Sequence, residues 1–371
     1  MTPDAADPTV PTAMSGEAGS TGTSGGGDPV GRASSGGAIA AFAAEVGPTE
    51  AGPVVAVGGR TQWDVGGPLD PAVDARTVRA PAGIVTVEAA DMTVRVRAGT
   101  TVVELDAALA EVGQAVALPA WPGATVGGVL AVGRSGLRRL GWGAVRDTVL
   151  EVRYVSAAGT VVTAGGPTVK NVSGFDLCRL LVGSLGTLGL LAEVVLRTRP
   201  LPATERWLAG PADPFALARR LHGPAAVLWD GSTTWVLLDG HPADVDEQAR
   251  LTGLDDADGP PALPPHRWSL RPSALRTLPE GAVTPAVDPR RLADDGGTAA
   301  VDPRLPAGAV RPGAFVAEVG VGIVHADVPL PSPPLDPAVA ALHGAIKRQF
   351  DPTGRLAPGR DPRAAARGGA A

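Results

Sequence analysis

The sequence predicts a mixed α+β protein with more than one domain. Its 371 residues suggest two or three domains, with ample apolar mass for a core. From about residue 38 to residue 200, short β-branched segments alternate with helical patterns. Pro200 and Pro202 then mark a boundary, beyond which a smaller module and a separate C-terminal helix are expected.

The composition argues against several classes of function. A formal net charge of −6 and a pI near 5.4 disfavour nucleic acid or an anionic membrane surface as main partner, because both require clustered Lys and Arg. The single cysteine, Cys178, allows neither an internal disulfide nor a cysteine-ligated zinc or iron–sulfur site within this chain, and we expect no metal site. No secretory signal is visible, and glycines interrupt the longest apolar run, 180–192. We therefore expect a cytoplasmic protein, able to dock on a membrane only through a partner.

The first domain is predicted to contain strands and short helices. Thr101 and Glu104 form a capping box, and apolar residues at helical spacing follow until Gly113. Ala158 and Gly159 form the turn of a predicted β-hairpin. The predicted strands are 54–57, 84–88, 93–98, 148–156, 160–163 and 190–198, and a further helix is expected over about 175–182.

Beyond Pro202 the pattern changes. The module from residue 205 to about 330 contains four of the seven tryptophans, and its stretch 253–312 is so rich in Pro, Asp and Gly that long loops are expected. Asp336 and Pro337 then form an N-cap and first-turn pair that begins a helix running to about Phe350.

Three glycine clusters at strand ends or helix starts are candidate ligand-binding loops. Glycines let backbone N–H groups turn toward a phosphate, and polar neighbours add donors. An ordinary tight turn explains the first cluster equally well, and a Gly-rich surface loop remains an alternative for the second. The first cluster is Gly58, Gly59, Arg60, Thr61 and Gln62; the second is Pro122, Gly123, Ala124, Thr125, Gly127 and Gly128, followed by Gly133, Ser135 and Gly136; the third is Gly183, Ser184, Gly186, Thr187 and Gly189.

The third cluster does not have the spacing of a classical nucleotide motif. GxGxxG would need glycine at position 185, and no Lys-Ser/Thr ending of a P-loop follows. A classical Rossmann NAD site is therefore disfavoured.

The order of the motifs resembles a known family. AVGGRTQWDVGG, PGATVGGVLAVGRSG, AVRDTVLEVRYVSAAGTVV, VKNVSGFDLCRLLVGSLGTLG and IKRQFDPTGRLAPGR follow one another as in the PCMH-type (vanillyl-alcohol-oxidase-like) FAD-binding family. The resemblance covers residues 39–200 well and 346–360 moderately. Within the family the chain is most similar to the FAD-binding subunit of glycolate oxidase.

This resemblance implies two α/β subdomains that enclose an extended FAD, together with a small α/β cap. The first cluster would hold the pyrophosphate, the second would line the pyrophosphate and the flavin side, and the third would pack against the adenosine half. The organisation implied is a disordered tail over 1–36, the FAD-binding domain over 37–204, a cap with long Pro/Gly loops over 205–332, a C-terminal helix and loop over 333–361 that return to the FAD domain, and a disordered tail over 362–371.

Several residues depart from the family pattern. Some members bind FAD covalently through a His in the first loop, and sometimes through a Cys as well. The first loop here has no His, and Cys178 lies on the apolar face of a predicted helix, which is typical of a buried structural thiol. We therefore expect noncovalent FAD. The terminal motif reads Ala357-Pro358-Gly359 where Asn-Pro-Gly is usual, so a flavin contact through that side chain is not expected.

No catalytic base can be assigned from the sequence. Lys170 is a candidate to stabilise negative charge on reduced flavin or on a substrate carboxylate, and a salt bridge with Asp176 is equally compatible. His325 only faintly resembles the His-rich cluster of related catalytic subunits, and a structural or surface role explains it better. Arg146 and Asp147 are interpreted as a structural ion pair.

The resemblance leaves three functional hypotheses open. The first is an FAD-dependent oxidoreductase acting on a 2-hydroxy acid, as the FAD-binding subunit of a glycolate-oxidase-type complex with a catalytic flavoprotein and an iron–sulfur subunit. The second is a non-catalytic flavin-binding subunit that relays electrons or stabilises such a complex. The third is a stand-alone FAD oxidoreductase of the same fold with another substrate.

Overall fold

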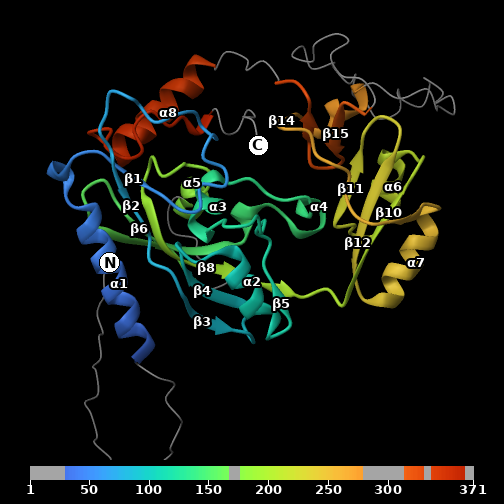
Figure 1. The fold of residues 1–371 in the computed structure, drawn as a ribbon, viewed down its shortest axis with the longest axis horizontal. Helices are drawn as coiled ribbons and strands as arrows, with labels where there is room; N and C mark the ends of the chain where they lie inside the picture. The colour runs from blue at the N-terminus through green and yellow to red at the C-terminus, as the bar shows by residue number, and fades with distance from the viewer. Residues whose placement is uncertain (1–29, 167–175, 279–312, 330–335, 364–371) are drawn as a thin grey trace, which may run out of the picture.

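The computed structural model describes residues 30–166, 176–278, 313–329 and 336–363, and side chains from residue 36 onward. Lys170 and most of the predicted tails lie outside these ranges. Two bodies are visible, an FAD-domain body that includes both ends of the described chain and a smaller cap (Figure 1). This arrangement confirms the α+β fold expected from the sequence.

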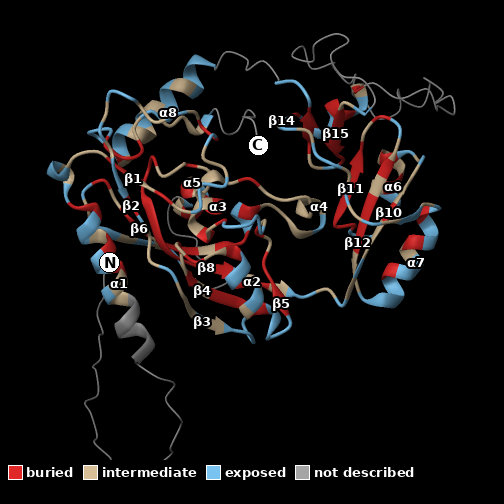
Figure 2. Ribbon diagram, viewed as in Figure 1, coloured by how far each residue is buried: buried red, intermediate tan, exposed pale blue. Residues whose placement is uncertain are grey.

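The core of the larger body is a five-stranded antiparallel sheet. Its strand order is β3-β4-β8-β6-β7, so the strand before the cap, β8, lies at the centre. The bounds are β3 (Ile84–Glu88), β4 (Thr93–Arg97), β8 (Leu190–Arg197), β6 (Val149–Val155) and β7 (Val161–Gly165). All but one residue of β8 are buried (Figure 2), which explains why this segment is a nearly continuous apolar run.

Helices cover this sheet on both faces. Buried side chains of α2 (Val102–Ala110), α3 (Val126–Val132) and α5 (Leu177–Leu181) form one core with the strands. A second core contains apolar residues of α1 (Val30–Val46) with β6 and β8 residues. The predicted capping box is present, because Thr101 Oγ1 accepts from the amide of Glu104 and the Glu104 carboxylate accepts from Thr101.

The N-terminal end of the described chain builds a small subdomain beside this sheet. Strands β1 (Val54–Ala56) and β2 (Arg76–Val78) pair in parallel, and Leu356 near the C-terminus forms a bridge to Val54. Helix α1 begins at Val30, inside the segment 1–36 that the sequence predicts to be disordered, so that boundary is wrong. The first residues of α1 are mostly small and give no apolar periodicity, whereas Ile39 and Phe42 dock on the sheet.

The cap is a seven-stranded antiparallel sheet with helices on one face. Its strand order is β13-β10-β12-β11-β15-β16-β14. The bounds are β10 (Thr204–Gly210), β11 (Ala226–Trp229), β12 (Thr234–Gly240), β13 (Asp255–Ala257), β14 (His266–Ser269), β15 (Phe315–Glu318) and β16 (Ile323–Ala326). Residues of α6 (Pro214–Arg220) and α7 (Pro242–Thr252) share a core with the outer face.

Short elements join these parts. A two-stranded ladder of β5 (Gln114–Ala115) and β9 (Arg199–Pro200) lies at the predicted domain boundary, and the short helix α4 (Arg139–Trp142) lies between the two bodies (Figure 1). The C-terminal helix α8 (Pro337–Phe350) begins as predicted, with Asp336 Oδ1 accepting from the Ala338 amide at 2.7 Å. The remaining short 3-10 turns are 49–51, 145–147 and 272–277.

Candidate functional site: glycine loops and the domain junction

The first glycine cluster is a loop of backbone amides without partners. Among the residues that the structure describes, none accepts a hydrogen bond from the amides of Gly58 through Gln62. Arg60 adopts a left-handed φ of 56°, and Gln62 Oε1 is buried without a partner. Gly59, Arg60 and Thr61 are exposed, so these amides are free to bind a ligand in place of water, whereas the buried Gln62 oxygen lacks a donor. The loop is therefore suited to an anionic ligand that also carries hydroxyl groups.

The second cluster lies directly against the first. A Cβ added to Gly59 would lie 1.7 Å from the Gly123 carbonyl oxygen, and one added to Gly58 would lie 2.3 Å from Thr125 Oγ1. Thr125 caps α3 by accepting from the Gly128 amide at 3.2 Å. Gly59 is therefore required because it touches the backbone of the second cluster, and Gly58 because it touches the capping hydroxyl of Thr125. The two clusters together border a small cavity of about 90 Å³.

The third cluster mainly supports the second. The Gly183 amide donates to Leu130 O at 2.9 Å and the Leu185 amide donates to Ala131 O at 2.8 Å, so both bonds support α3. A Cβ on Gly189 would lie 2.4 Å from the Tyr154 ring. Gly186 and Gly189 also border a cavity of about 70 Å³ that the first and second clusters line. The cluster thus meets the other two, but most of its amides are used within the protein.

The C-terminal loop closes the first glycine loop from the other side. Arg360 donates to the carbonyl oxygens of Trp63, Val65 and Gly67, and its guanidinium lies 4.3 Å from the Trp63 ring centroid. Arg360 also borders the 90 Å³ cavity. Ala357 itself is buried against β1 and does not border the cavity.

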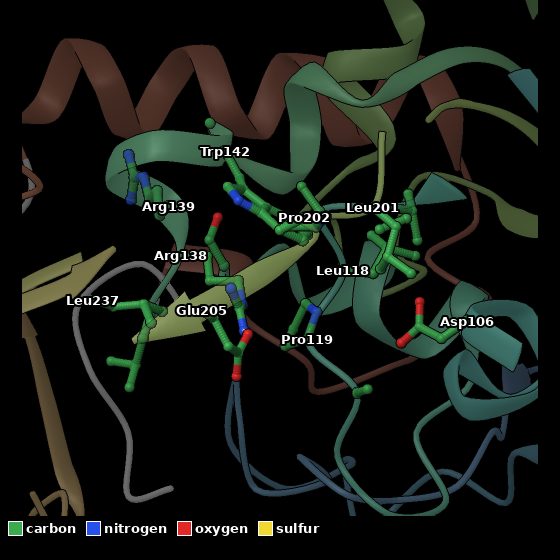
Figure 3. A pocket seen from close by; sticks show the side chains of 18 of the residues that line it. Asp106, Leu118, Pro119, Arg138, Arg139, Trp142, Leu201, Pro202, Glu205 and Leu237 are labelled. Atoms are coloured by element: carbon green, nitrogen blue, oxygen red, sulfur yellow. The ribbon is translucent and has the colours of Figure 1, made fainter. Parts of the chain in front are cut away.

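A second loop with free amides faces the cap. Within the described ranges, the amides of residues 134–138 have no acceptor, while Ser135 Oγ accepts from the Val145 amide at 3.1 Å. Ser135 and Gly136 line a cavity of about 660 Å³ between the two bodies. Figure 3 shows Asp106 on one side of this cavity and Arg138, Glu205 and Leu237 on the other.

Polar contacts fix the cap to this loop. Arg138 donates to Asp239 Oδ2 at 2.8 Å and pairs with Glu205. Trp142 Nε1 donates to the same Asp239 oxygen at 2.8 Å, and Arg199 stacks on the Trp142 ring at 4.4 Å. The sequence analysis did not single out these residues, because their partners come from strands some 60 to 100 positions away.

Asp106 on α2 lines the junction cavity. Burial raises its pKa to about 6, and it forms no hydrogen bond or ion pair with a described residue. The charged form is thus disfavoured in the folded protein. In the unfolded chain the pKa of Asp106 is near 4, so the folded protein becomes less stable relative to the unfolded chain as the pH rises from about 4 to about 6.

Replacing Asp106 with asparagine is expected to remove this pH-dependent loss. Asp106→Asn should raise the urea midpoint at pH 8 and change it little at pH 4, where the wild-type carboxyl is protonated. Urea unfolding of both proteins at the two pH values measures the difference. Equal shifts at both pH values would contradict the assigned pKa.

Cys178 is buried as predicted, away from the free amides of the first loop. Its Sγ lies 3.5 Å from Ala164 O and 3.7 Å from Leu150 O, and burial raises its pKa to about 11. The thiol is therefore protonated and covered at neutral pH. We expect less than about one hundredth of the unfolded-state rate with a thiol reagent such as DTNB, because accessible thiolate governs that rate. Comparing native and urea-unfolded protein tests this, and equal rates would contradict burial.

Of the two catalytic candidates, Lys170 and His325, the structure describes only His325. Lys170 lies outside the described residues. His325 is buried on β16, and its Nε2 lies 2.9 Å from Glu318 Oε1 on β15.

Arg146 and Asp147 do not pair as expected. Asp147 instead binds Arg179 at 2.7 Å, and Asp176 caps α5 and also pairs with Arg179. The turn of α5 brings Arg179 to both carboxylates.

Comparison with known proteins identifies the glycine-loop region. Residues 39–165 match the family described as FAD binding domain. Residues 39–165 form an FAD-binding domain. A 130-residue segment is 42% identical to glycolate oxidase subunit GlcE of Escherichia coli (strain K12), covering 34% of this chain and 37% of that protein. A 106-residue segment is 42% identical to a D-lactate dehydrogenase of Archaeoglobus fulgidus, covering 28% of this chain and 24% of that protein.

The matched segments span little more than a third of these relatives, or less. The fold likeness extends further, because a solved structure of alkyldihydroxyacetonephosphate synthase aligns over 87% of this chain and 74% of that one, with a TM-score of 0.57 at 13% identity. At this identity the likeness concerns the fold alone. Residues 39–165 thus identify FAD as the cofactor, and the matched segments relate the chain to glycolate oxidase subunits and D-lactate dehydrogenases.

The described residues of this FAD-binding domain fit the cofactor. Its pyrophosphate requires several donors in a small space, which the free amides of the first loop supply. Its ribityl and ribose hydroxyls match the unpartnered oxygen of Gln62. No described helix is both long enough and apolar enough to cross a membrane.

Proposed function

We propose that this chain is the FAD-binding subunit of a 2-hydroxy-acid dehydrogenase of the glycolate-oxidase type. The observation that carries the proposal is the run of unpartnered amides in the first loop of the FAD-binding domain, in a chain with a 130-residue segment 42% identical to a glycolate oxidase subunit. The amides of Gly58 through Gln62 would hold the pyrophosphate. The loop 133–136 would line the flavin side at the domain junction, and Gly186 and Gly189 would border the adenosine half.

FAD is held without a covalent bond in this proposal. The first loop contains no His, and the protonated Cys178 is covered by β6 and β7 carbonyls. Bound FAD would accept two electrons from a hydroxy acid. The chain's own residues would orient the acid at the junction and receive its hydroxyl proton. Asp106 and the His325–Glu318 pair are the titratable groups that support this role, because half-buried Asp106 lines the junction cavity and the pair is buried in the cap.

Electrons would leave through a partner subunit, because the single cysteine cannot ligate an iron–sulfur cluster. We place this partner complex in the cytoplasm.

The second hypothesis, a non-catalytic relay subunit, is supported by one observation. Arg138, Glu205 and Trp142 line the cavity where a substrate would enter, and their polar groups are already bound to one another or to Asp239.

Anaerobic reduction separates the two. Glycolate and D-lactate are added in turn to the FAD-loaded chain, and flavin absorbance near 450 nm is followed. The catalytic proposal expects bleaching with at least one acid, whereas dithionite alone should bleach a relay subunit. If neither acid bleaches the flavin, with or without the purified partner subunits of the native host, the 2-hydroxy-acid assignment is wrong.

A further inference from the structure

Three arginine side chains lie at the domain junction, one of them within electrostatic range of the other two. Arg134 follows α3, Arg139 lies on α4 and Arg267 lies on β14 of the cap. We call them the junction arginines. Among the described residues, none of the three side chains forms a hydrogen bond or a close ion pair. Arg134 is only 6% exposed, and its Nε and Nη2 atoms are buried without any acceptor. A buried guanidinium with two unused donors requires an explanation.

The cap presents a matching polar group on the same sheet face. Arg267 pairs across strands with His325, and His325 pairs with Val316, so these three side chains share one face. Val316 belongs to the cluster that includes Leu137 and Trp142 of the FAD domain, so this face is the one turned toward the loop 134–138. Glu318 lies on this face as well, bound to His325, and its Oε2 has no partner.

The electrostatics of the junction favour an added negative charge. Burial and the neighbouring Arg267 lower the pKa of Arg134 to about 10, so the guanidinium remains protonated at neutral pH. Burial also lowers the pKa of Arg267, with Arg139 acting in the same direction and Glu318 opposing. Arg267 therefore lies within electrostatic range of both Arg134 and Arg139, and the carboxylate that acts on Arg267, Glu318, is also bound to His325.

We propose that the junction arginines bind the carboxylate of a small monocarboxylic acid, clamped between the FAD domain and the cap. Guanidinium groups bind carboxylates through paired hydrogen bonds, and the unused Nε and Nη2 of Arg134 form such a pair. A monoanion fits better than phosphate, because the Glu318 carboxylate would repel a second negative charge. This inference rests on the proposed function and assigns its substrate carboxylate to the junction arginines, of which Arg134 and Arg267 are tested below.

Binding of oxamate, a monocarboxylate that cannot be oxidised as a hydroxy acid, tests the inference. Titration calorimetry is performed on FAD-loaded wild type, Arg134→Gln and Arg267→Gln. Each substitution should weaken oxamate binding about tenfold or more, because it removes a charged donor of the clamp. Arg267→Lys should recover part of the affinity by keeping the charge. Arg219→Gln, on the exposed outer side of α6, is the matched control and should stay within about twofold.

Several results would overturn the inference. One is equal oxamate affinity in wild type and both Gln variants, and another is phosphate binding as tight as oxamate binding. A third is oxamate binding only in FAD-depleted protein, which would mean that the flavin itself occupies the arginines. Flavin absorbance and far-UV circular dichroism are recorded for every variant. A loss of FAD from wild type would contradict the proposed function, whereas unchanged FAD with unchanged oxamate affinity contradicts the arginine clamp alone.

Discussion

Gly59→Ala is expected to weaken FAD binding about 10- to 100-fold, because overpacking a rigid contact costs about 1–3 kcal/mol. The new methyl group would lie 1.7 Å from the Gly123 carbonyl oxygen, which is backbone and cannot rotate away. The first loop must therefore separate from the second cluster, and its free amides lose their common geometry. FAD titration of the apoprotein, followed by flavin fluorescence quenching, measures the effect.

Gly259→Ala is the matched control for this experiment. Gly259 lies in a cap loop, has no positive φ, and an added Cβ would have no neighbour within 4 Å. Its FAD affinity should equal that of wild type. If Gly59→Ala binds FAD as tightly as Gly259→Ala, the contact between the first two clusters does not shape the cofactor site.

Arg355→Ala should lower the free energy of unfolding by about 2–4 kcal/mol, because buried carbonyl oxygens lose a charged donor. The Arg355 guanidinium donates to the carbonyls of Val46, Gly47, Gly52 and Ala157 at 2.8–3.0 Å. It thereby joins the C-terminal loop to α1 and to the β6–β7 turn. The loss is less than four full bonds, since Val46 O also accepts from Arg76.

Urea unfolding of Arg355→Ala and Arg348→Ala tests this expectation. Arg348 is exposed on α8 and makes no hydrogen bond or ion pair with a described residue, so its removal should change stability by less than about 0.5 kcal/mol. Similar stabilities of the two variants would show that the C-terminal loop is not fastened through Arg355.

Local signals in the sequence predicted much of the fold. The capping box at Thr101, the Asp336 cap and the strands around β8 each depend on a few neighbouring residues, and the structure has them in place. The start of α1 was missed because its first residues carry no apolar period, and docking of Ile39 and Phe42 decides where the helix packs.

The candidate site was predictable only in part, because local patterns are visible in a sequence and contacts between distant segments are not. Glycine clusters are visible in a sequence because close contact excludes a Cβ, as at Gly59 against the Gly123 backbone. Arg134 lies inside the second cluster but has no local signal of its own. Its neighbour Arg267 is brought close by cap strands that pair across more than 50 positions, and the sequence offers no sign of that register.

The central claim is that the glycine loops bind FAD without a covalent bond. The most direct test is the visible spectrum of the purified chain after reconstitution with FAD and gel filtration, followed by acid precipitation. The account predicts flavin bands on the native protein and release of all flavin into the supernatant as FAD. Absence of flavin after reconstitution would contradict FAD binding, and flavin retained in the precipitate would contradict the noncovalent site.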